Sequence, residues 1–224
     1  MPKLEWENRS EKKHGKNAWK KRNGDKKHKM KDENPLLKSA PIQKVVFMGA
    51  PSTGKTTMVK AAAAYFDTQY VLEYGKEYWQ KHQVERLLTQ EQLLYVAQEQ
   101  IRQENAAIEH CDTFLFVDTN ALTTWHFAMD YYGSALPELS MLAEQSKQRF
   151  DHVFLCGDDI PFEDTWERSG DVKRHEFQAF ITKQLEKRGI QYHYLEGNVQ
   201  SRLATLVAIL SKIKVSLATP CPRA

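Results

Sequence analysis

The stretch VVFMGAPSTGKTTMVKAAAAYF, residues 45–66, places a glycine-bounded loop between an apolar run and a helix-like run. Gly49 to Thr56 fits the pattern GxxxxGK[ST], and a strand before it with a helix after it is the context in which this pattern binds phosphate. Glycines let backbone N–H groups face the phosphates, and the N-terminus of the next helix adds a favourable dipole. The stretch therefore predicts an α/β domain built around a phosphate-binding loop.

Residue types within the loop predict ATP and Mg²⁺ as ligands. Lys55 supplies a cation to the phosphates, and the hydroxyl of Thr56 offers an oxygen to Mg²⁺. No NKxD-type motif for guanine is present in the sequence, which disfavours a GTPase switch. The residues expected to contact the nucleotide from this loop are Gly49, Ser52, Thr53, Gly54, Lys55, Thr56 and Thr57.

A second metal ligand is expected at the end of another apolar strand. The run FLFVD, residues 114–118, places Asp118 at the carboxyl edge of the sheet, where open α/β sheets bind ligands. We interpret Asp118 as the carboxylate that holds Mg²⁺ together with Thr56. The alternative is that Asp118 caps the segment that follows it.

The rest of the chain from Ile42 onward alternates short β-rich runs with longer segments of helical period. This order predicts a P-loop NTPase fold, with a mainly parallel five-stranded sheet and helices on both faces. The expected strands are residues 44–48, 69–73, 113–117, 152–156 and 191–195. Thr89 and Gln92 predict a capping box, followed by a core-facing stripe of Leu94, Ala97, Ile101 and Ile108. Phe177 to Leu185 predicts a further amphipathic helix that ends near Gly189.

The net charge is distributed unevenly along the chain. Residues 1–39 contain thirteen Lys or Arg against six Asp or Glu, a net charge of +7, so the remainder of the +3 chain carries −4. We expect residues 1–39 to form a basic, disordered tail, residues 40–214 the P-loop kinase-like domain, and residues 215–224 a frayed end. Nucleic-acid contact through the tail is possible but not favoured, because only two tryptophans there offer stacking surfaces.

Cysteine usage and hydropathy indicate a cytoplasmic protein. Cys111, Cys156 and Cys221 fit neither a disulfide framework nor a zinc pattern. The sequence begins without an apolar signal region, and its longest apolar runs fall far short of a membrane span. Oligomeric state is left open.

Phosphoryl transfer depends on neutralising the charge of the transferred phosphate, so we expect cations besides Lys55 to reach it. Residues 157–174 follow a strand directly, are rich in polar and turn residues, and resemble a lid. Arg168 and Arg174 would close on the triphosphate from this segment, and a solvated charged loop is the alternative. On the acceptor side, Glu73 falls where a second strand ends, with Tyr74 and Trp79 nearby, so Glu73 is our candidate for orienting or deprotonating a hydroxyl.

Taken in order, these motifs resemble a known family. GxxxxGKT at residues 49–56, EYGKEY at 73–78, FVDT at 116–119, Pro161 followed by Arg168, and Gly197 followed by Arg202 are similar to the nicotinamide-riboside kinase domain of the bacterial NadR type, in the AAA_28 group of P-loop proteins. The resemblance covers about residues 42–212. It implies that Lys55, Thr56, Asp118 and Arg168 act on ATP and Mg²⁺, and that Glu73 and Tyr74 belong to the acceptor pocket.

Several positions depart from the family pattern, and three of them concern the substrate site. Asn120 replaces the second Asp of its (F/V)DTD motif, Leu72 stands where its riboside kinases have Trp, and Ile101 lies near an expected aromatic. In the family, those two rings would sandwich a nicotinamide. We expect Asn120 in the substrate site, and Trp125 and Tyr74 as replacements for the lost rings, although Trp125 equally fits a core position.

The sequence therefore predicts an ATP- and Mg²⁺-dependent kinase of a nucleoside-like metabolite, with nicotinamide riboside as the first candidate. The alternative is an ATP-binding regulatory P-loop ATPase without small-molecule kinase activity. A third interpretation, an RNA-directed P-loop enzyme, draws only on the basic tail.

Overall fold

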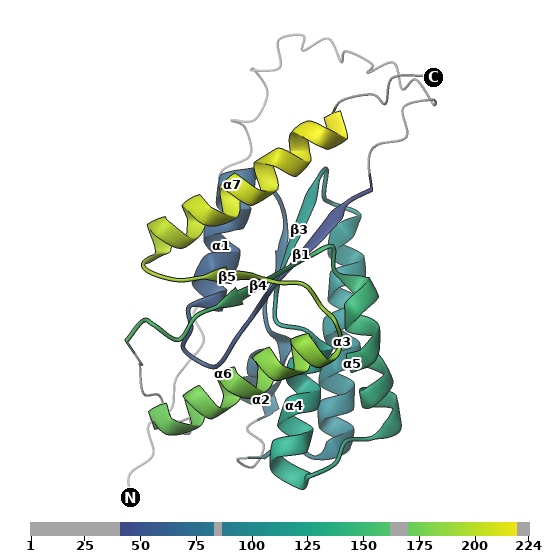
Figure 1. The fold of residues 1–224 in the computed structure, drawn as a ribbon. Coiled ribbons are helices and arrows are strands. Elements are labelled where there is room, and N and C mark those ends of the chain that lie inside the picture. The colour runs from purple at the N-terminus through teal and green to yellow at the C-terminus, as the bar shows by residue number, and fades with distance from the viewer. Residues whose placement is uncertain (1–40, 83–86, 162–169, 219–224) are drawn as a thin grey trace, which may run out of the picture. The chain divides into compact units, whose positions relative to one another are not determined.

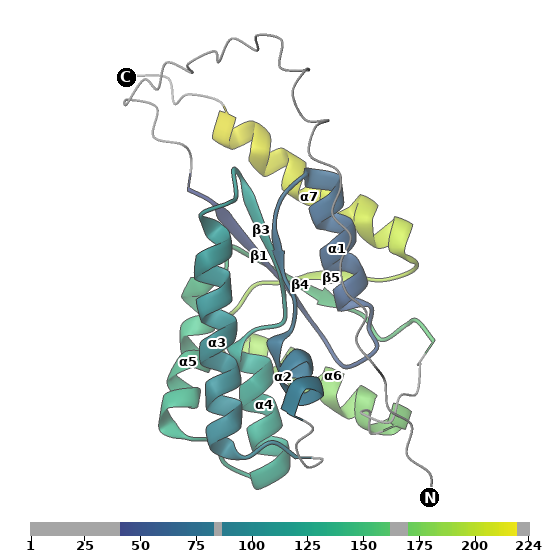
Figure 2. The ribbon, with the colours of Figure 1, turned by 180° about the vertical axis from the view of Figure 1, so that it is seen from behind.

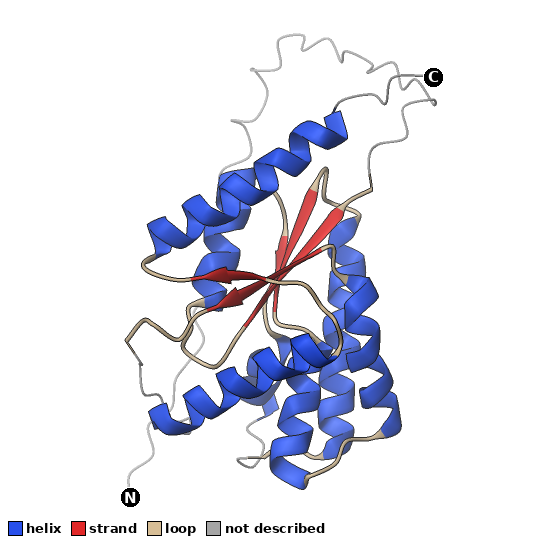
Figure 3. Ribbon diagram, viewed as in Figure 1, coloured by secondary structure: helices blue, strands red, loops and turns tan. Residues whose placement is uncertain are grey.

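The structure is a computed structural model that describes residues 41–82, 87–161 and 170–218. The described residues form one five-stranded sheet with the order β2-β3-β1-β4-β5, in which every neighbouring pair is parallel (Figure 1, Figure 3). The strands are β1 (Gln43–Met48), β2 (Tyr70–Val71), β3 (Phe114–Asp118), β4 (His152–Cys156) and β5 (His193–Leu195). All five predicted strands are thus confirmed, although β2 and β5 are shorter than expected.

Helices cover both faces of this sheet. They are α1 (Lys55–Phe66), α2 (Tyr74–His82), α3 (Gln90–Ile108), α4 (Ala121–Tyr132), α5 (Pro137–Arg149), α6 (Gly170–Lys187) and α7 (Val199–Ala218). Seen from both sides, α1 and α7 lie on one face and the other helices on the opposite face (Figure 1, Figure 2). The arrangement confirms the α/β P-loop NTPase fold.

The central strand β1 shows why the chain folds into these layers. Val45 and Phe47 pack with residues of α1 and α7, whereas Val46 and Met48 pack with residues of α4, α5 and α6. Successive side chains of a strand point to opposite faces, so a strand that is apolar throughout is buried on both. β1 lies between β3 and β4. The carboxyl ends of the three strands therefore meet at the edge where doubly wound sheets bind ligands.

The predicted capping box of α3 is confirmed. Gln92 N donates to the Thr89 hydroxyl at 3.2 Å, and Thr89 N donates to Gln92 Oε1 at 2.9 Å. The predicted core stripe of α3 is wrong in part. Leu94, Ile101 and Ile108 are half-buried, while the fully buried residues are Leu93, Val96, Ala97, Gln100 and Glu104. The spacing of hydrophobic residues does not predict this buried face, because two of its residues, Gln100 and Glu104, are polar.

The last residues of the predicted lid segment, 157–174, are helical in the structure. α6 begins at Gly170, so Lys173 and Arg174 lie in the first turns of a helix and not in a loop. Arg168 and the basic segment 1–39 lie outside the described residues. α7 continues past residue 214, where we expected the domain to end. Within the described parts of the chain, no helix is both long and apolar enough to cross a membrane.

Candidate active site

The phosphate loop joins β1 to α1 and needs left-handed backbone at several positions. The φ angles of Gly49, Ser52 and Gly54 are 135°, 59° and 79°. Inside the loop, the Thr53 hydroxyl and Lys55 Nζ each donate to the carbonyl oxygen of Ala50 at 2.8 Å. Lys55 is buried, so its ammonium group is held within the curve of the loop. The loop is therefore shaped by its own side chains.

Gly49 allows the loop to pass very close to β4. A Cβ atom at this position would lie 2.7 Å from the carbonyl oxygen of Cys156 and 3.0 Å from Thr53 Oγ1. The 2.7 Å contact is shorter than real Cβ atoms show, and the φ of 135° also disfavours an L side chain. Both effects restrict this position to glycine.

Thr56, at the start of α1, and Asp118, at the end of β3, bring two oxygen-bearing side chains together beside the loop. The Thr56 hydroxyl donates to Asp118 Oδ2 at 2.5 Å, whereas Asp118 Oδ1 is buried and has no hydrogen-bond partner among the described residues. Burial raises the pKa of the Asp118 carboxyl, and the neighbouring Lys55 charge and the Thr56 hydrogen bond oppose that effect. A hydroxyl beside an unsatisfied carboxylate oxygen fits Mg²⁺, which takes hard oxygen ligands.

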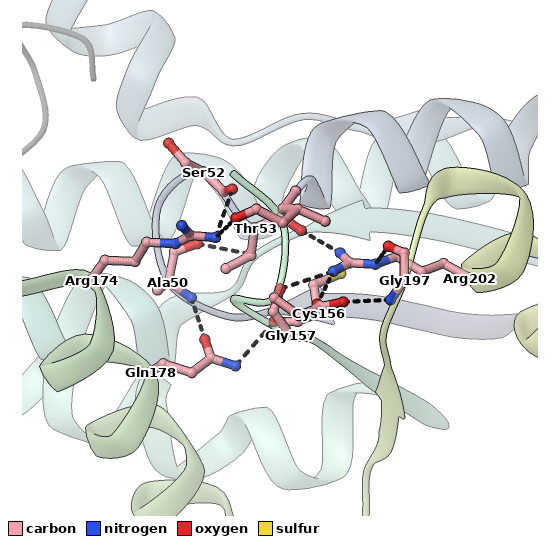
Figure 4. Close-up of polar contacts among 11 residues, drawn as sticks. Ala50, Ser52, Thr53, Cys156, Gly157, Arg174, Gln178, Gly197 and Arg202 are labelled. Atoms are coloured by element: carbon pink, nitrogen blue, oxygen red, sulfur yellow. Dashed lines mark hydrogen bonds and ion pairs between the residues drawn. The ribbon is translucent and has the colours of Figure 1, made fainter. Parts of the chain in front are cut away.

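Two side chains of α6, Arg174 and Gln178, contact the phosphate loop and its surroundings (Figure 4). Gln178 Oε1 accepts from Ala50 N at 2.8 Å, and Gln178 Nε2 donates to the carbonyl of Cys156 at 3.0 Å. Arg174 is buried, and its Nη2 donates to the carbonyls of Ile160 at 2.9 Å and Ser52 at 3.4 Å. Arg174 was predicted to bind the triphosphate. In the structure it lines the cavity while contacting the loop backbone.

Arg202 of α7 holds the loop from another direction (Figure 4). Its side chain is 2% exposed and donates to the carbonyl oxygens of Thr53 at 2.6 Å, Gly157 at 3.0 Å and Gly197 at 2.9 Å. Asp159 Oδ1, 2.5 Å from Arg202 Nη2, supplies the counter-charge. The phosphate loop, the end of β4 and the turn after β5 are thereby joined by one guanidinium group. Sequence reasoning noted Arg202 only as part of a family pattern and missed its contact with the loop.

The loop opens into a cavity of about 1030 Å³ that also contains the predicted acceptor residue Glu73. Glu73 lies two residues after the end of β2 and shares the cavity wall with Gly75 and Lys76. Buried Gln100 of α3 fixes this region, because its Oε1 accepts from Tyr74 N at 2.8 Å and its Nε2 lies 3.5 Å from the Asp118 carbonyl. Gln100 was also missed by the sequence analysis.

Beyond Glu73 the cavity wall is apolar and aromatic. Trp79 of α2 and Phe127 and Tyr131 of α4 line it. Two of the three departures named above, Leu72 and Ile101, are not part of the described cavity lining, and Leu72 is exposed. The cavity therefore has aromatic surface from Trp79, which the sequence analysis placed near Glu73, and from Phe127 and Tyr131, which it did not anticipate.

Of the other predicted substrate residues, one lines the cavity and two do not. Asn120 lines the cavity, but its side chain also caps α4 by accepting from Leu122 N at 3.0 Å. Tyr74 packs in a cluster with Tyr78 and Tyr95 and is not part of the described lining. Trp125 packs against the core, donating from Nε1 to Ser140 Oγ at 3.2 Å, and is likewise outside that lining. Trp125 thus takes the core position that we considered as its alternative.

Comparison with known proteins places this site in context. The model of the AAA_28 family, described as an AAA domain, matches residues 44–202. The trifunctional NAD biosynthesis/regulator protein NadR of Escherichia coli (strain K12) is 29% identical over 159 residues, which cover 69% of this chain and 38% of that protein. The chain thus spans less than half the length of the curated relatives it matches.

Two solved structures have the same fold. A NadR protein in complex with NAD and AMP-PNP superposes with a TM-score of 0.61 at 20% identity, covering 82% of this chain and 52% of that one. A NadR protein in complex with NR superposes with a TM-score of 0.62 at 21% identity, with the same coverage. These findings confirm the family resemblance that the sequence motifs indicated.

Proposed function

Since the chain belongs to the AAA_28 family of AAA domains, we propose that it is a kinase that uses ATP and Mg²⁺ to phosphorylate a hydroxyl group of a nucleoside-like small molecule. The observation that carries this proposal is a single cavity lined by the phosphate loop, by Thr56, whose hydroxyl is hydrogen-bonded to Asp118, and by Glu73. Phosphoryl transfer needs a nucleotide, charge neutralisation and an oriented acceptor in one enclosure. We assign this activity to residues 40–214.

Each group has a distinct role in the proposed reaction. Lys55 and the backbone N–H groups of the loop neutralise and orient the phosphates. Thr56 and Asp118 would hold Mg²⁺, which supplies positive charge at the phosphate oxygens. Glu73 orients the acceptor hydroxyl and takes its proton as the oxygen attacks the terminal phosphorus of ATP, whose bond to the bridging oxygen breaks so that ADP leaves. Arg168, which lies outside the described residues, is proposed as a further cation at that phosphate.

We propose nicotinamide riboside as the first acceptor to test. The curated relative is named for NAD biosynthesis, and one of the solved relatives is a complex with NR. Trp79, Phe127 and Tyr131 supply aromatic surface in the cavity, and a cationic ring over an aromatic face gains about 0.5–2 kcal/mol. The alternative, a regulatory ATPase, has the same phosphate loop but needs no acceptor.

The test is turnover of ATP to ADP with a panel of nucleosides that includes nicotinamide riboside, with the product mass read directly. Lys55→Ala is the inactive blank, and Lys60→Ala is the matched control because Lys60 is exposed on the same helix. A phosphorylated riboside that is absent from the blank and present in the control supports the kinase. ATP binding without phosphorylation of any panel member would overturn it in favour of the regulatory ATPase.

A separate variant tests the acceptor side. Glu73→Gln keeps the shape of the side chain but cannot take a proton. We expect a drop in kcat of about 100-fold or more with an almost unchanged KM for ATP. Unchanged turnover of every acceptor would remove Glu73 from the mechanism.

A further inference from the structure

One face of α4 turns toward the cavity. Thr123, His126, Phe127 and Asp130 line it at the i, i+3, i+4 and i+7 spacing of a single helical face. None of these residues was assigned a role by the sequence analysis. His126 stands out because it is 7% exposed and yet carries two polar ring nitrogens.

The surroundings of His126 are aromatic. Its ring centroid lies 4.1 Å from that of Phe177, edge to face, and 4.0 Å from that of Phe180. Both phenylalanines belong to α6 and also line the cavity. The imidazole extends from α4 and packs against two rings of α6, and these contacts fix its position in the cavity wall.

Hydrogen bonding of the ring is incomplete. Nδ1 is buried and has no partner among the described residues. An enclosed N–H without a partner costs more than an enclosed lone pair, so the proton of the neutral ring is better placed on Nε2. Burial also lowers the pKa of His126 to about 4, which keeps the ring uncharged at neutral pH. Unlike Nδ1, Nε2 is not among the buried atoms without a partner, so the N–H donor belongs to the ring nitrogen that is accessible at the cavity that His126 lines.

We propose that His126 is a substrate-recognition residue that donates a hydrogen bond from Nε2–H to a carbonyl oxygen on the base of the phosphate acceptor. This inference rests on the proposed kinase function and specifies the chemistry of its acceptor, an uncharged carbonyl group such as a carboxamide on an aromatic ring. The aromatic ring of the acceptor base packs on the aromatic wall of the cavity, and His126 forms a hydrogen bond to the carbonyl group attached to that ring. A site built to satisfy such a group rejects analogues that lack it, because the donor is then left unpaired.

The experiment compares two substrates in four proteins. The substrates are nicotinamide riboside, or whichever panel nucleoside the wild type phosphorylates, and the analogue that lacks the base carbonyl. The proteins are wild type, His126→Phe, His126→Gln and His152→Phe. Phe keeps the aromatic packing without a donor, and Gln restores a donor. His152 is the matched control, because it too has one ring nitrogen, Nε2, that is buried without a partner among the described residues, but it lies in β4 and outside the cavity lining.

We expect the wild type and His152→Phe to lose about tenfold in kcat/KM when the carbonyl is removed, mainly through KM. His126→Phe should lose less than about threefold, since its hydrogen bond is already gone, and His126→Gln should fall between. The KM for ATP should be unchanged in all four. An equal loss in wild type and His126→Phe overturns the inference, as does a preferred acceptor without a base carbonyl. If the wild type phosphorylates no nucleoside, the proposed function itself fails.

Discussion

The hydroxyl of Thr56 lies 2.5 Å from Oδ2 of Asp118, and this hydrogen bond joins the first turn of α1 to the last residue of β3. The other carboxylate oxygen is buried without a partner among the described residues. The protein thus keeps a carboxylate where burial disfavours its charge. That cost is the physical reason to expect a cation at this position.

Asp118→Asn should separate stability from activity. Burial raises the pKa of Asp118 above its unfolded value, so at neutral pH the charged group favours the unfolded state, and removing it should raise the free energy of unfolding of the ligand-free protein. The same change should lower kcat/KM by about 100-fold and weaken stabilisation by Mg²⁺ and ATP. Thermal unfolding with and without Mg²⁺ and ATP measures both effects. Asp112→Asn, at an exposed position, is the control, and a destabilised ligand-free Asp118→Asn would contradict this account.

Arg202→Met should damage ATP binding more than chemistry. It removes the donors to the Thr53 and Gly157 carbonyls and leaves Asp159 without its cation, so we expect about 3 kcal/mol lower stability and a KM for ATP raised about tenfold. Arg202→Lys should recover part of both. Arg188→Met is the control, because it removes a different buried guanidinium, which pairs with Glu144 at 2.8 Å. This variant should have lower stability but an unchanged KM for ATP. If both methionine variants change the KM equally, Arg202 has no specific effect on the loop.

Gly49→Ala should distort the phosphate loop. Its Cβ would press on the Cys156 carbonyl, which we expect to cost about 1–3 kcal/mol in stability and most of the ATP affinity. Gly133→Ala is the matched control. Gly133 also has a positive φ, 68°, but an added Cβ would meet nothing within 4 Å. Calorimetric titration with ATP should show a defect in the first variant only.

His126 should make stability depend on pH. Its pKa of about 4 in the folded state is below the ordinary value near 6.5, so the unfolded state binds more protons between these values. Stability should therefore fall as the pH drops from about 6.5 toward 4, by up to about 3 kcal/mol from this group. Asp130 opposes the shift in part. In denaturant titrations across this range, His126→Phe should show a shallower slope than His110→Phe, which changes an exposed histidine.

Local features of the fold and the site were predictable from the sequence. The phosphate loop, the five strands and the capping box of α3 each depend on residues close together in the chain, where spacing and residue type determine the geometry. Asp118 belongs to this group because an acid at the end of an apolar strand must lie at the ligand-binding edge.

Residues that support the site through backbone atoms were not predictable in this way. Gln178 contacts Ala50 across 128 positions, and Arg202 contacts Thr53 across 149. Their partners are N–H and C=O groups, which every residue carries, so no side-chain pattern marks the pairing. Gln100 and Glu104 were missed for a related reason, since a hydrophobic period does not reveal a polar residue on a buried helix face.

The position of Arg202 in the last helix has a consequence for synthesis of the chain. The phosphate loop is made early, but the guanidinium that holds its Thr53 carbonyl comes from α7, the final described element. During translation, β1 and α1 emerge long before residue 202 leaves the ribosome, and contacts between such distant residues form late in folding. A nascent chain that stops short of α7 should therefore carry the whole nucleotide motif and still bind ATP poorly, so nucleotide binding reports that the fold is complete.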